Sequence, residues 1–301
     1  MKLQCPVCQA GMGELDSLNP QGAACPQCGF ALASSDGILR ALAPDRRAFF
    51  SRFLRDYGTI RKAEGRGSSD RAYYLALPFQ DLSGRNSGQW RIRAATYRYF
   101  ESKLLPERCC DVLDIGAGNG WMSNRLSLRG HRPVAVDIFT DPLDGLGAAR
   151  EFGSFPCVEA EFDRLPFAGG QFDLAVFNSS LHYSTDYHGT LAEARRCLRP
   201  GGRIVVLDSP LYKRREHGEK MRGERHRQFQ AQYGFPSDSV PSLEYLYESQ
   251  LDGLSRDLGL RWRILQPWYG WKWHLRPLKA RLQGKRPPSR FCVLVASAAT
   301  S

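Results

Sequence analysis

One short stretch, residues 112–120 ("VLDIGAGNG"), constrains the fold more than any other part of this chain. Four apolar or acidic residues are followed by glycine at positions 116, 118 and 120. The apolar run predicts a buried strand. Glycine on alternate positions leaves the following turn without side chains, so a ligand can approach its backbone closely. The stretch therefore predicts a strand that leads into a ligand-binding turn.

From position 110 onward, short apolar runs alternate with helical patterns. We expect strands at "DVLDIG", "RPVAVDI", "FPCVEA", "FDLAVFN" and "GRIVVLDS". Helices are expected between them near residues 121–128, 142–152 and 187–198. This alternation is typical of an α/β fold with a doubly wound, mostly parallel sheet, which binds ligands at the carboxyl ends of its strands. Two earlier helices, one from Pro44 and one over about 88–105, are expected to cover an edge of the sheet.

The spacing of the glycines separates two classes of nucleotide ligand. A dinucleotide turn, G-x-G-x-x-G/A, requires a small residue at position 121, where this chain has Trp121. The observed pattern is D-x-G-x-G-x-G, formed by Asp114 with Gly116, Gly118 and Gly120. It resembles the first motif of class I S-adenosylmethionine-dependent methyltransferases. The resemblance implies that the turn, Ala117 included, carries the amino-acid part of the cofactor, with the Asp114 carboxylate directed toward its ammonium group.

Four further segments resemble this family in the same order, over roughly residues 109–297. Asp137, followed by Ile138, ends the second strand where the family has an acid for the ribose hydroxyls. "EAEFDRLPF" resembles the third motif and implies that Glu161, followed by Phe162, accepts a hydrogen bond from the adenine amine. "FDLAVFNSSLHY" resembles the fourth motif and adds Asn178 to the cofactor site. "LRPGGRIVVLD" resembles the turn into the fifth strand. Together they imply a Rossmann-like, seven-stranded sheet with an antiparallel seventh strand, "FCVLVAS".

The residues after the fourth strand indicate which acceptors are favoured. His182 and Tyr183 follow that strand at the expected mouth of the site and are the candidate catalytic residues. A histidine there could take a proton from a methyl acceptor or could orient a loop, and both roles remain open. Enzymes of this family that methylate exocyclic amines carry N/D-P-P-Y/F in the fourth motif, whereas this chain has "NSSL". Oxygen, carbon, ring nitrogen and sulfur acceptors therefore remain.

The N-terminal cysteines form two C-x2-C pairs, Cys5 with Cys8 and Cys25 with Cys28. Four thiolates in this spacing are typical of a closed structural zinc site, so we expect Zn²⁺ to stabilise a ribbon and to take no part in chemistry. The other five cysteines are expected to be small buried hydrophobic residues. The chain then divides into a zinc ribbon (1–40), a helical linker and lid (41–108) and a methyltransferase domain (109–301) with basic insertions at about 209–241 and 268–288.

Positive charge is concentrated in two of the later segments. The formal net charge is +11, while residues 211–230 carry seven Lys or Arg against three Glu, and residues 261–290 carry nine against none. Both segments connect strands from the ends that face the substrate, so we expect the basic residues to surround the entrance to the site. Trp271 and Trp273 are candidates for contact with substrate, and Trp262 is expected in the core. Tyr57, Arg61 and Glu64 share a helix face that could form a lid, although surface salt bridges are the simpler interpretation.

Three functional hypotheses follow. The first is methyl transfer to a small-molecule or lipid-linked acceptor that is acidic or phosphorylated, in an enzyme that resembles the ubiquinone-biosynthesis methyltransferases. The second is an RNA base methyltransferase that grips rRNA or tRNA with the ribbon and the basic rim; the third is a non-catalytic cofactor-binding scaffold. Basic and aromatic residues also fit peripheral contact with an anionic membrane. The N-terminus has no apolar signal region and no transmembrane segment is evident, so we expect a cytoplasmic protein; the sequence does not indicate its oligomeric state.

Overall fold

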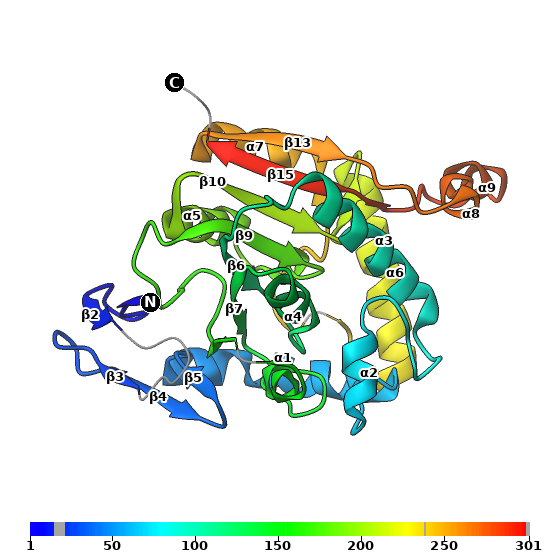
Figure 1. The fold of residues 1–301 in the computed structure, drawn as a ribbon. Helices are drawn as coiled ribbons and strands as arrows, with labels where there is room; N and C mark the ends of the chain where they lie inside the picture. Colours follow the sequence, from blue (N-terminus) through cyan, green and yellow to red (C-terminus); the bar gives the residue numbers. More distant parts are fainter. Residues whose placement is uncertain (15–21, 154, 238, 299–301) are drawn as a thin grey trace.

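A ten-stranded sheet forms the centre of the computed structural model, which describes residues 1–14, 22–153, 155–237 and 239–298 (Figure 1). Its strand order is β13-β15-β10-β9-β6-β7-β8-β5-β4-β3. The first seven in this order are the strands expected after position 110: β6 (Asp111–Ile115), β7 (Arg132–Asp137), β8 (Cys157–Glu159), β9 (Phe172–Asn178), β10 (Leu198–Leu207), β13 (Leu260–Leu265) and β15 (Val293–Ala298). β6 runs parallel to β7 and β9, and β15 runs antiparallel to β10 and β13. The predicted α/β fold with an antiparallel seventh strand is thereby confirmed.

The strand count is larger than predicted because the N-terminal segment extends the sheet. β5 (Ile38–Arg40) pairs in parallel with β8, with Ile38 opposite Cys157. β4 (Ala31–Ser35) and β3 (Ala23–Ala24) continue the sheet by antiparallel pairing. An edge strand offers unpaired N–H and C=O groups, and β5 supplies partners for those of β8. The expected seven strands become ten, and the cysteine-rich segment is joined to the sheet.

Two small sheets flank the central one. β1 (Lys2–Gln4) and β2 (Gly11–Glu14) form an antiparallel pair in the N-terminal segment. The other small sheet has the order β12-β11-β14 and consists of β12 (Leu246–Tyr247), β11 (Pro210–Tyr212) and β14 (Arg290–Phe291).

Apolar side chains alternate along each central strand and fill a core on both faces of the sheet. On one face, Leu113 and Ile115 pack with residues of α5 (Tyr187–Cys197) and α7 (Glu248–Leu258). On the other, Val112 and Val205 pack with residues of α2 (Arg71–Ala76), α3 (Ser87–Lys103) and α4 (Trp121–Leu128). Helices therefore cover both faces, and the carboxyl ends of the parallel strands stay free for a site.

Most of the predicted helices are present. α1 (Pro44–Ala63) begins at Pro44, whose fixed φ suits a first helical position, and α3 matches the second predicted helix. The helix expected over 142–152 is instead a 3-10 segment, η1 (Leu146–Glu151), since Gly145 and Gly147 interrupt the helical pattern. α2 was not predicted; the Asp70 side chain caps it by accepting a hydrogen bond from the Ala72 N–H.

The last elements lie apart from the sheet. α8 (Trp271–His274) and α9 (Arg276–Leu282) project beyond the end of β13 in Figure 1, while α6 (Arg215–Tyr233) contacts β11 and β12. Within the described residues, no helix combines the length and apolar character needed to cross a bilayer.

Candidate functional site

The glycine turn lies where the sequence predicts it, between β6 and α4. The N–H groups of Gly116 and Ala117 donate to the Val136 carbonyl at 2.8 and 3.0 Å, which holds the turn against the end of β7. Gly116 and Gly118 have φ of +77° and +56°, a region that disfavours other residues. A Cβ at position 116 would lie 2.2 Å from the Ser180 Cβ, whereas at position 118 no described atom lies within 4 Å of that point. The turn is therefore tightly packed at position 116 and open at position 118.

Asp137 closes the turn from the neighbouring strand. Its Oδ2 accepts a hydrogen bond from the Gly118 N–H at 2.8 Å, and its Oδ1 accepts one from the Phe139 N–H at 2.8 Å. Burial raises the pKa of Asp137 above its usual value, while these hydrogen bonds oppose the shift. A carboxylate oxygen has two lone pairs, so each Asp137 oxygen can accept one more hydrogen bond. The carboxylate is thus fixed in position and keeps acceptor capacity for a ligand.

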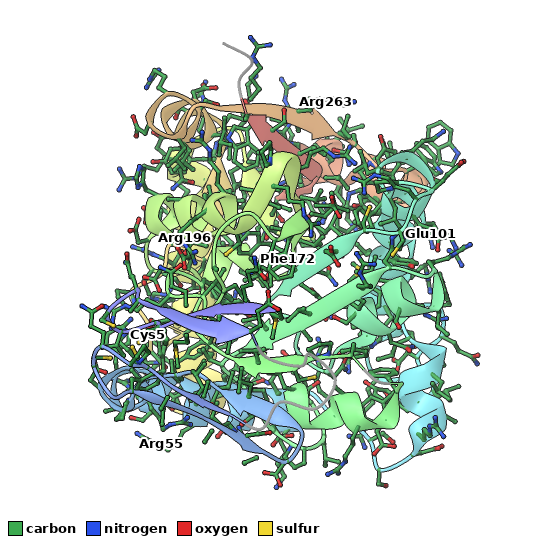
Figure 2. The ribbon with its side chains drawn as sticks, turned by 60° about the vertical axis from the view of Figure 1, so that its left-hand side comes forward. Cys5, Arg55, Glu101, Phe172, Arg196 and Arg263 are labelled. Carbon is green, nitrogen blue, oxygen red and sulfur yellow. The ribbon has the colours of Figure 1, made fainter. Side chains whose placement is uncertain are left out.

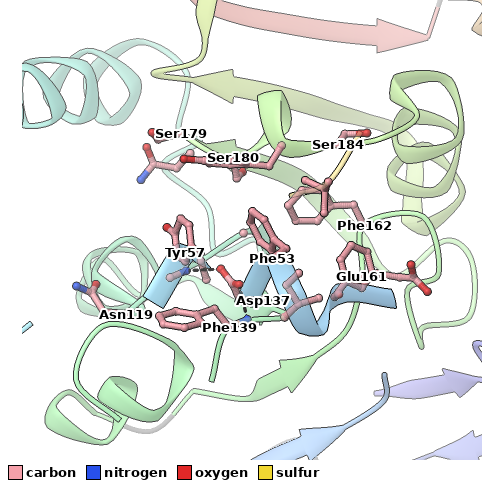
Figure 3. Close-up of a pocket in the computed structure, with 18 of the residues that line it drawn as sticks. Phe53, Tyr57, Asn119, Asp137, Phe139, Glu161, Phe162, Ser179, Ser180 and Ser184 are labelled. Carbon is pink, nitrogen blue, oxygen red and sulfur yellow. Dashed lines mark hydrogen bonds between the residues drawn. The ribbon is translucent and has the colours of Figure 1, made fainter. Parts of the chain in front are cut away.

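A cavity of about 980 Å³, partly open to solvent, lies over this turn. Figure 3 shows Ser179, Ser180 and Ser184 along one side of it, and Asp137 and Phe139 along the other. The predicted site residues that line it are Gly116, Ala117, Gly118, Asp137, Ile138, Glu161, Phe162, Asn178 and Tyr183. The structure therefore brings together most of the residues chosen from the sequence.

Asp114 and Gly120, two of the predicted cofactor residues, lie beneath the turn and do not line the cavity. The Asp114 side chain is fully buried, and its Oδ2 accepts a hydrogen bond from the Ser123 hydroxyl at 2.7 Å. Burial raises the pKa of Asp114 to about 7. Its Oδ1 is buried and has no hydrogen-bond partner among the described residues. The expectation that this carboxylate faces the ligand directly is therefore not met in this structure.

His182 also lies outside the cavity lining. It is 5% exposed, and its Nδ1 lies 3.2 Å from the Ser209 hydroxyl. Burial, followed by the nearby Arg225 and Arg93 charges, lowers the pKa of His182 to about 3. Such an imidazole is a weak proton acceptor at neutral pH. Its catalytic role stays an untested prediction without support from this placement, whereas Tyr183 does line the cavity.

Glu161 lines the cavity and is held by an arginine from α1. The Arg46 guanidinium donates to both Glu161 oxygens at 2.7–3.0 Å, and Arg164 lies 3.6 Å away. The Glu161 side chain is 4% exposed, so this bidentate pair is nearly dry on the carboxylate side. Burial raises the pKa of Glu161, and the Arg46 hydrogen bonds oppose the shift. Any adenine contact by Glu161 would use lone pairs that Arg46 leaves free.

The helices α1 and α3 supply a wall that the sequence indicated only weakly. Tyr57 and Arg61 of α1 line the cavity, and the Arg61 guanidinium pairs with Asp144. The Asp144 side chain is 6% exposed and that of Arg61 is 16% exposed, so this pair is not the surface salt bridge that was expected. The i, i+4 spacing of Tyr57 and Arg61 predicts that the two residues share a helix face. The spacing does not predict which part of the protein that face contacts.

Arg93 of α3 is the least compensated cation in the cavity wall. Its guanidinium donates to the Ser179 hydroxyl at 3.4 Å, and the guanidinium carbon lies 4.9 Å from the centre of the Trp90 ring. Unlike Arg61, it forms no ion pair with a carboxylate of the described residues. Burial, followed by the Arg66 and Arg61 charges, lowers the pKa of Arg93 to about 10, so it stays charged at neutral pH. The wall therefore holds a positive charge that interacts with the buried Asp208 carboxylate but forms no direct ion pair with it.

A second cavity of about 780 Å³ adjoins the first and shares six of its lining residues, Arg93 and Arg61 among them. Its further cations are Arg66 and Arg225, and its acids are Asp56 and Glu64. Of the two basic insertions, only the first contributes here, through Arg225 of α6. No residue of 268–288 lines either cavity, so the prediction that both insertions surround the entrance stays untested for the second one. Trp271 and Trp273, which lie in that insertion, do not line the site.

The four N-terminal cysteines converge as the spacing predicts. The sulfur atoms of Cys5, Cys8, Cys25 and Cys28 all lie within 4.8 Å of one another. The Cys5–Cys28 and Cys8–Cys25 sulfur distances are 3.6 and 3.5 Å. Tetrahedral zinc with bonds of about 2.3 Å places its thiolates about 3.8 Å apart, so the cluster is close to that geometry.

The cysteine-bearing segment is packed against the loop that follows Glu161. The Gln4 N–H donates to the Pro166 carbonyl at 3.2 Å, and the Ala168 N–H donates to the Lys2 carbonyl at 3.0 Å. Leu3, 2% exposed, belongs to the main core. Figure 2 shows Cys5 and Arg196 on the same flank, and the Arg196 guanidinium donates to the Gln4 side chain at 2.7 Å. One end of the cavity wall is thus supported by the N-terminal segment.

Comparisons with known proteins agree with this geometry. A family described as a methyltransferase domain matches residues 113–206. The chain is 31% identical over 127 residues to a malonyl-[acyl-carrier protein] O-methyltransferase of Erwinia pyrifoliae, covering 40% of this chain and 47% of that protein. It is 38% identical over 97 residues to a demethylmenaquinone methyltransferase of Mycolicibacterium vanbaalenii, covering 32% and 41%. The matched regions thus span less than half of either relative.

Among solved structures, a chain of the complex between the Haloferax volcanii Trm112 methyltransferase activator and a methyltransferase has the same fold. The TM-score is 0.51 at 18% identity, and the match covers 76% of this chain and 97% of that one. The glycine turn and Asp137 both lie within residues 113–206, the part of the chain that matches a methyltransferase domain, and the solved structure shows the same fold.

Proposed function

We propose that this protein transfers a methyl group from S-adenosylmethionine to a small acceptor that carries a carboxylate or phosphate. The observation that carries the proposal is the open glycine turn beside Asp137, beneath a cavity lined by Arg93, which forms no direct ion pair among the described residues. S-adenosylmethionine supplies a methyl group already activated on a positively charged sulfur. The protein then has to bind, align the acceptor and exclude water.

The residues present fit this cofactor. The space above Gly118 is clear of described atoms within 4 Å of a would-be Cβ, which permits close contact with the backbone. Asp137 retains lone pairs for two hydroxyl groups. The Asn178 Oδ1, in the cavity wall, is buried and lacks a hydrogen-bond partner among the described residues, so it is available to an ammonium or hydroxyl donor. A buried acceptor of this kind costs free energy unless a ligand supplies a donor.

The electrostatics of the wall favour an acidic acceptor. Arg93 and Arg61 border both cavities, and only Arg61 has a carboxylate partner, Asp144, among the residues described. The buried Asp208 carboxylate interacts with Arg93 without contacting it, and an anionic group on the acceptor would give the Arg93 guanidinium a direct partner.

An acidic oxygen acceptor also matches the absence of His182 from the cavity lining. A carboxylate is deprotonated at neutral pH and needs no general base to become nucleophilic. The Erwinia relative is named an O-methyltransferase, which agrees with transfer to oxygen. Phe53, Tyr57, Phe139 and Tyr183 would pack around the apolar part of the acceptor and keep water out.

We also propose that Cys5, Cys8, Cys25 and Cys28 bind one structural Zn²⁺. Four thiolates leave no open position on a tetrahedral ion, so the metal would stabilise the N-terminal segment and not the reaction. That segment packs on the loop after Glu161 and does not present a free surface there, which favours a structural role over an RNA grip.

The test compares acceptors that differ only in charge. Transfer of labelled methyl from S-adenosylmethionine is measured with matched pairs, each a carboxylic acid or phosphate and its neutral amide or ester, for the wild type and for Arg93→Gln. We expect acidic members to be preferred, and Arg93→Gln to lower their kcat/KM by about tenfold or more, the effect of losing one charged hydrogen bond.

Arg91→Gln is the matched control, because Arg91 is an exposed arginine of the same helix whose side chain forms no hydrogen bond or ion pair with the described residues. Equal turnover of neutral and acidic members, or equal loss in the two variants, would contradict the acidic acceptor. Calorimetry with S-adenosylhomocysteine runs in parallel. If Arg93→Gln weakens that binding, the guanidinium holds the carboxylate of the cofactor and the assignment to the acceptor is wrong.

A further inference from the structure

The segment 268–285, which contains α8 and α9, carries an unusual amount of exposed apolar surface. Five large side chains in it are more than half exposed: Trp268 (55%), Trp271 (74%), Leu275 (54%), Leu278 (55%) and Leu282 (80%). Exposed hydrophobic residues scattered singly need no explanation, but a contiguous group of this size on a soluble surface indicates an interaction site.

Four of these side chains form one stripe. Leu275 joins the two helices and keeps a helical conformation (φ −78°, ψ −8°), so residues 271–282 follow a nearly continuous helix. At about 100° per residue, positions 271, 275, 278 and 282 fall within an arc of about 60°. The spacing therefore gathers one tryptophan and three leucines on a single face.

Cations flank this stripe on both sides. In the same projection, Lys272 and Lys279 lie beside one edge and Arg281 beside the other, and Lys285 follows the helix. All four side chains are exposed and form no hydrogen bond or ion pair with the residues that the structure describes, and residues 261–290 contain no Asp or Glu. The charges are therefore free to meet an anionic surface.

The opposite face of the segment is firmly attached to the body. Trp273 packs against the Tyr269 ring at 5.1 Å and the Phe291 ring at 5.5 Å, and the Arg276 guanidinium lies over Trp273 at 3.2 Å. The Tyr269 hydroxyl lies 2.9 Å from the Thr96 hydroxyl and donates to the Phe291 carbonyl at 2.9 Å. The exposed stripe thus belongs to a helical segment that is packed against the rest of the protein.

We infer that the 268–285 segment docks on an anionic lipid bilayer, with the stripe inserted among the acyl chains and the cations against the headgroups. A helix with an apolar face, flanking Lys or Arg and an interfacial tryptophan has the composition that binds in this plane. RNA binding would use the cations and the aromatic rings but would leave three leucines in water. Pairing of two copies through the stripe would bring four unpaired cations of each chain together.

The orientation is consistent with this surface. In Figure 1, α8 and α9 lie on the side toward which β10 and β13 point, the same side as the turn after β6. Docking there would bring the edge of the sheet that carries the cavity toward the bilayer. The inference itself stands on the stripe and its cations and does not depend on the chemistry proposed for the cavity.

Vesicle flotation with the full chain tests the inference, using phosphatidylcholine vesicles with and without 30% phosphatidylglycerol. We expect binding to the anionic vesicles that the Leu278→Glu/Leu282→Glu variant lowers at least tenfold. Lys272→Gln/Lys279→Gln should also lower it at least tenfold, since each cation near an anionic surface contributes about fivefold. The emission of the wild type should shift to the blue on binding, and Trp271→Phe should remove most of that shift.

Matched controls carry the same changes elsewhere: Leu128→Glu, at a leucine 68% exposed at the end of α4, and Lys103→Gln/Lys220→Gln. These should bind as the wild type does. The inference is overturned by equal binding to neutral vesicles, by no binding at all, or by equal loss in test and control variants. Two further results would overturn it if the wild type does not bind vesicles. One is binding of a single-stranded RNA that the Leu278→Glu/Leu282→Glu variant weakens, and the other is dimerisation in solution that this variant weakens. S-adenosylhomocysteine binding is measured for every variant. If it is retained while vesicle binding fails, the membrane inference is wrong and the proposed chemistry is unaffected.

Discussion

At the scale of single residues, the site depends on two glycines without side chains and on a carboxylate whose position is fixed by hydrogen bonds. Gly116 and Gly118 both have positive φ, but their surroundings differ: position 116 faces the Ser180 side chain, and position 118 faces open space. Asp137 is fixed by two N–H donors and still has lone pairs to offer. These three residues give the cavity one wall that can bind a ligand without rearrangement.

The two glycines are expected to respond differently to alanine. Gly118→Ala should cost about 1 kcal/mol of unfolding free energy, the effect of positive φ alone, and should weaken S-adenosylhomocysteine binding, because its methyl group would occupy the open space above the turn. Gly116→Ala should cost more, since its Cβ would lie 2.2 Å from the Ser180 Cβ. Chemical denaturation and calorimetry measure the two effects. Full cofactor affinity in a folded Gly118→Ala variant would contradict the position of the ligand.

His182 should make the protein sensitive to acid. Its pKa is about 3 in the folded protein, below the ordinary value of 6.5, so the unfolded chain binds the proton first as the pH falls. The stability that the neutral ring provides is complete above pH 6.5 and is lost toward pH 3. The difference in unfolding free energy between the wild type and His182→Gln should therefore shrink by about 1.4 kcal/mol per pH unit between pH 6 and pH 4. Denaturant titrations at several pH values measure it, and a constant difference would show that His182 is protonated in the fold.

At the scale of elements, the N-terminal segment is part of the support of the cavity. β5 adds to the edge of the sheet beside β8, β1 bonds to the loop at Pro166 and Ala168, and α1 places Arg46 on Glu161. Three elements from the first 63 residues of the chain thus hold the Glu161 side of the cavity. The four cysteines lie between β1 and β5 in the sequence and would fix these pieces to one another through the metal.

The cysteine cluster should bind one zinc ion per chain. Loss of that ion should weaken the binding of ligand in the cavity. We expect Cys5→Ser/Cys25→Ser to lose the metal and to lower both the melting temperature and the affinity for S-adenosylhomocysteine, because the support around Glu161 loosens. Metal analysis, thermal unfolding and calorimetry measure this. Cys109→Ser, at an exposed cysteine outside the cluster, is the control and should change none of the three. A variant without metal but with full stability and affinity would contradict the supporting role.

What could be predicted from the sequence was local, and what could not depended on packing between distant segments. The turn at Gly116, the acid at Asp137 and the cysteine pairs have fixed spacings within short stretches. The pairing of β5 with β8 had no such signal, since three residues form the strand and 119 positions separate Ile38 from Cys157. Arg93 likewise meets the cavity only because α3 lies over the end of the sheet. The burial of His182 follows from its neighbours in space and not from its place after β9.

At the scale of the whole molecule, three regions with different features can be distinguished. The carboxyl ends of the parallel strands carry the cavity, the cysteine-bearing segment supports one end of it, and the 268–285 segment projects from the body with its apolar stripe. The positive charge follows the same division: Arg93 and Arg225 face the cavities, while Lys272 and Lys279 face outward. The net charge of +11 thus includes cations in two separate places, at the cavities and on the outer surface.

The most direct test of the central claim, that the open turn and Asp137 form a cofactor site, is calorimetric titration of the purified chain with S-adenosylhomocysteine. The wild type should bind one molecule per chain. Asp137→Asn should weaken binding by about tenfold or more, since the charged acceptor is lost. Asp252→Asn, at an exposed acid of α7, should leave it unchanged. No binding by the folded wild type, or equal affinity in Asp137→Asn, would contradict the account.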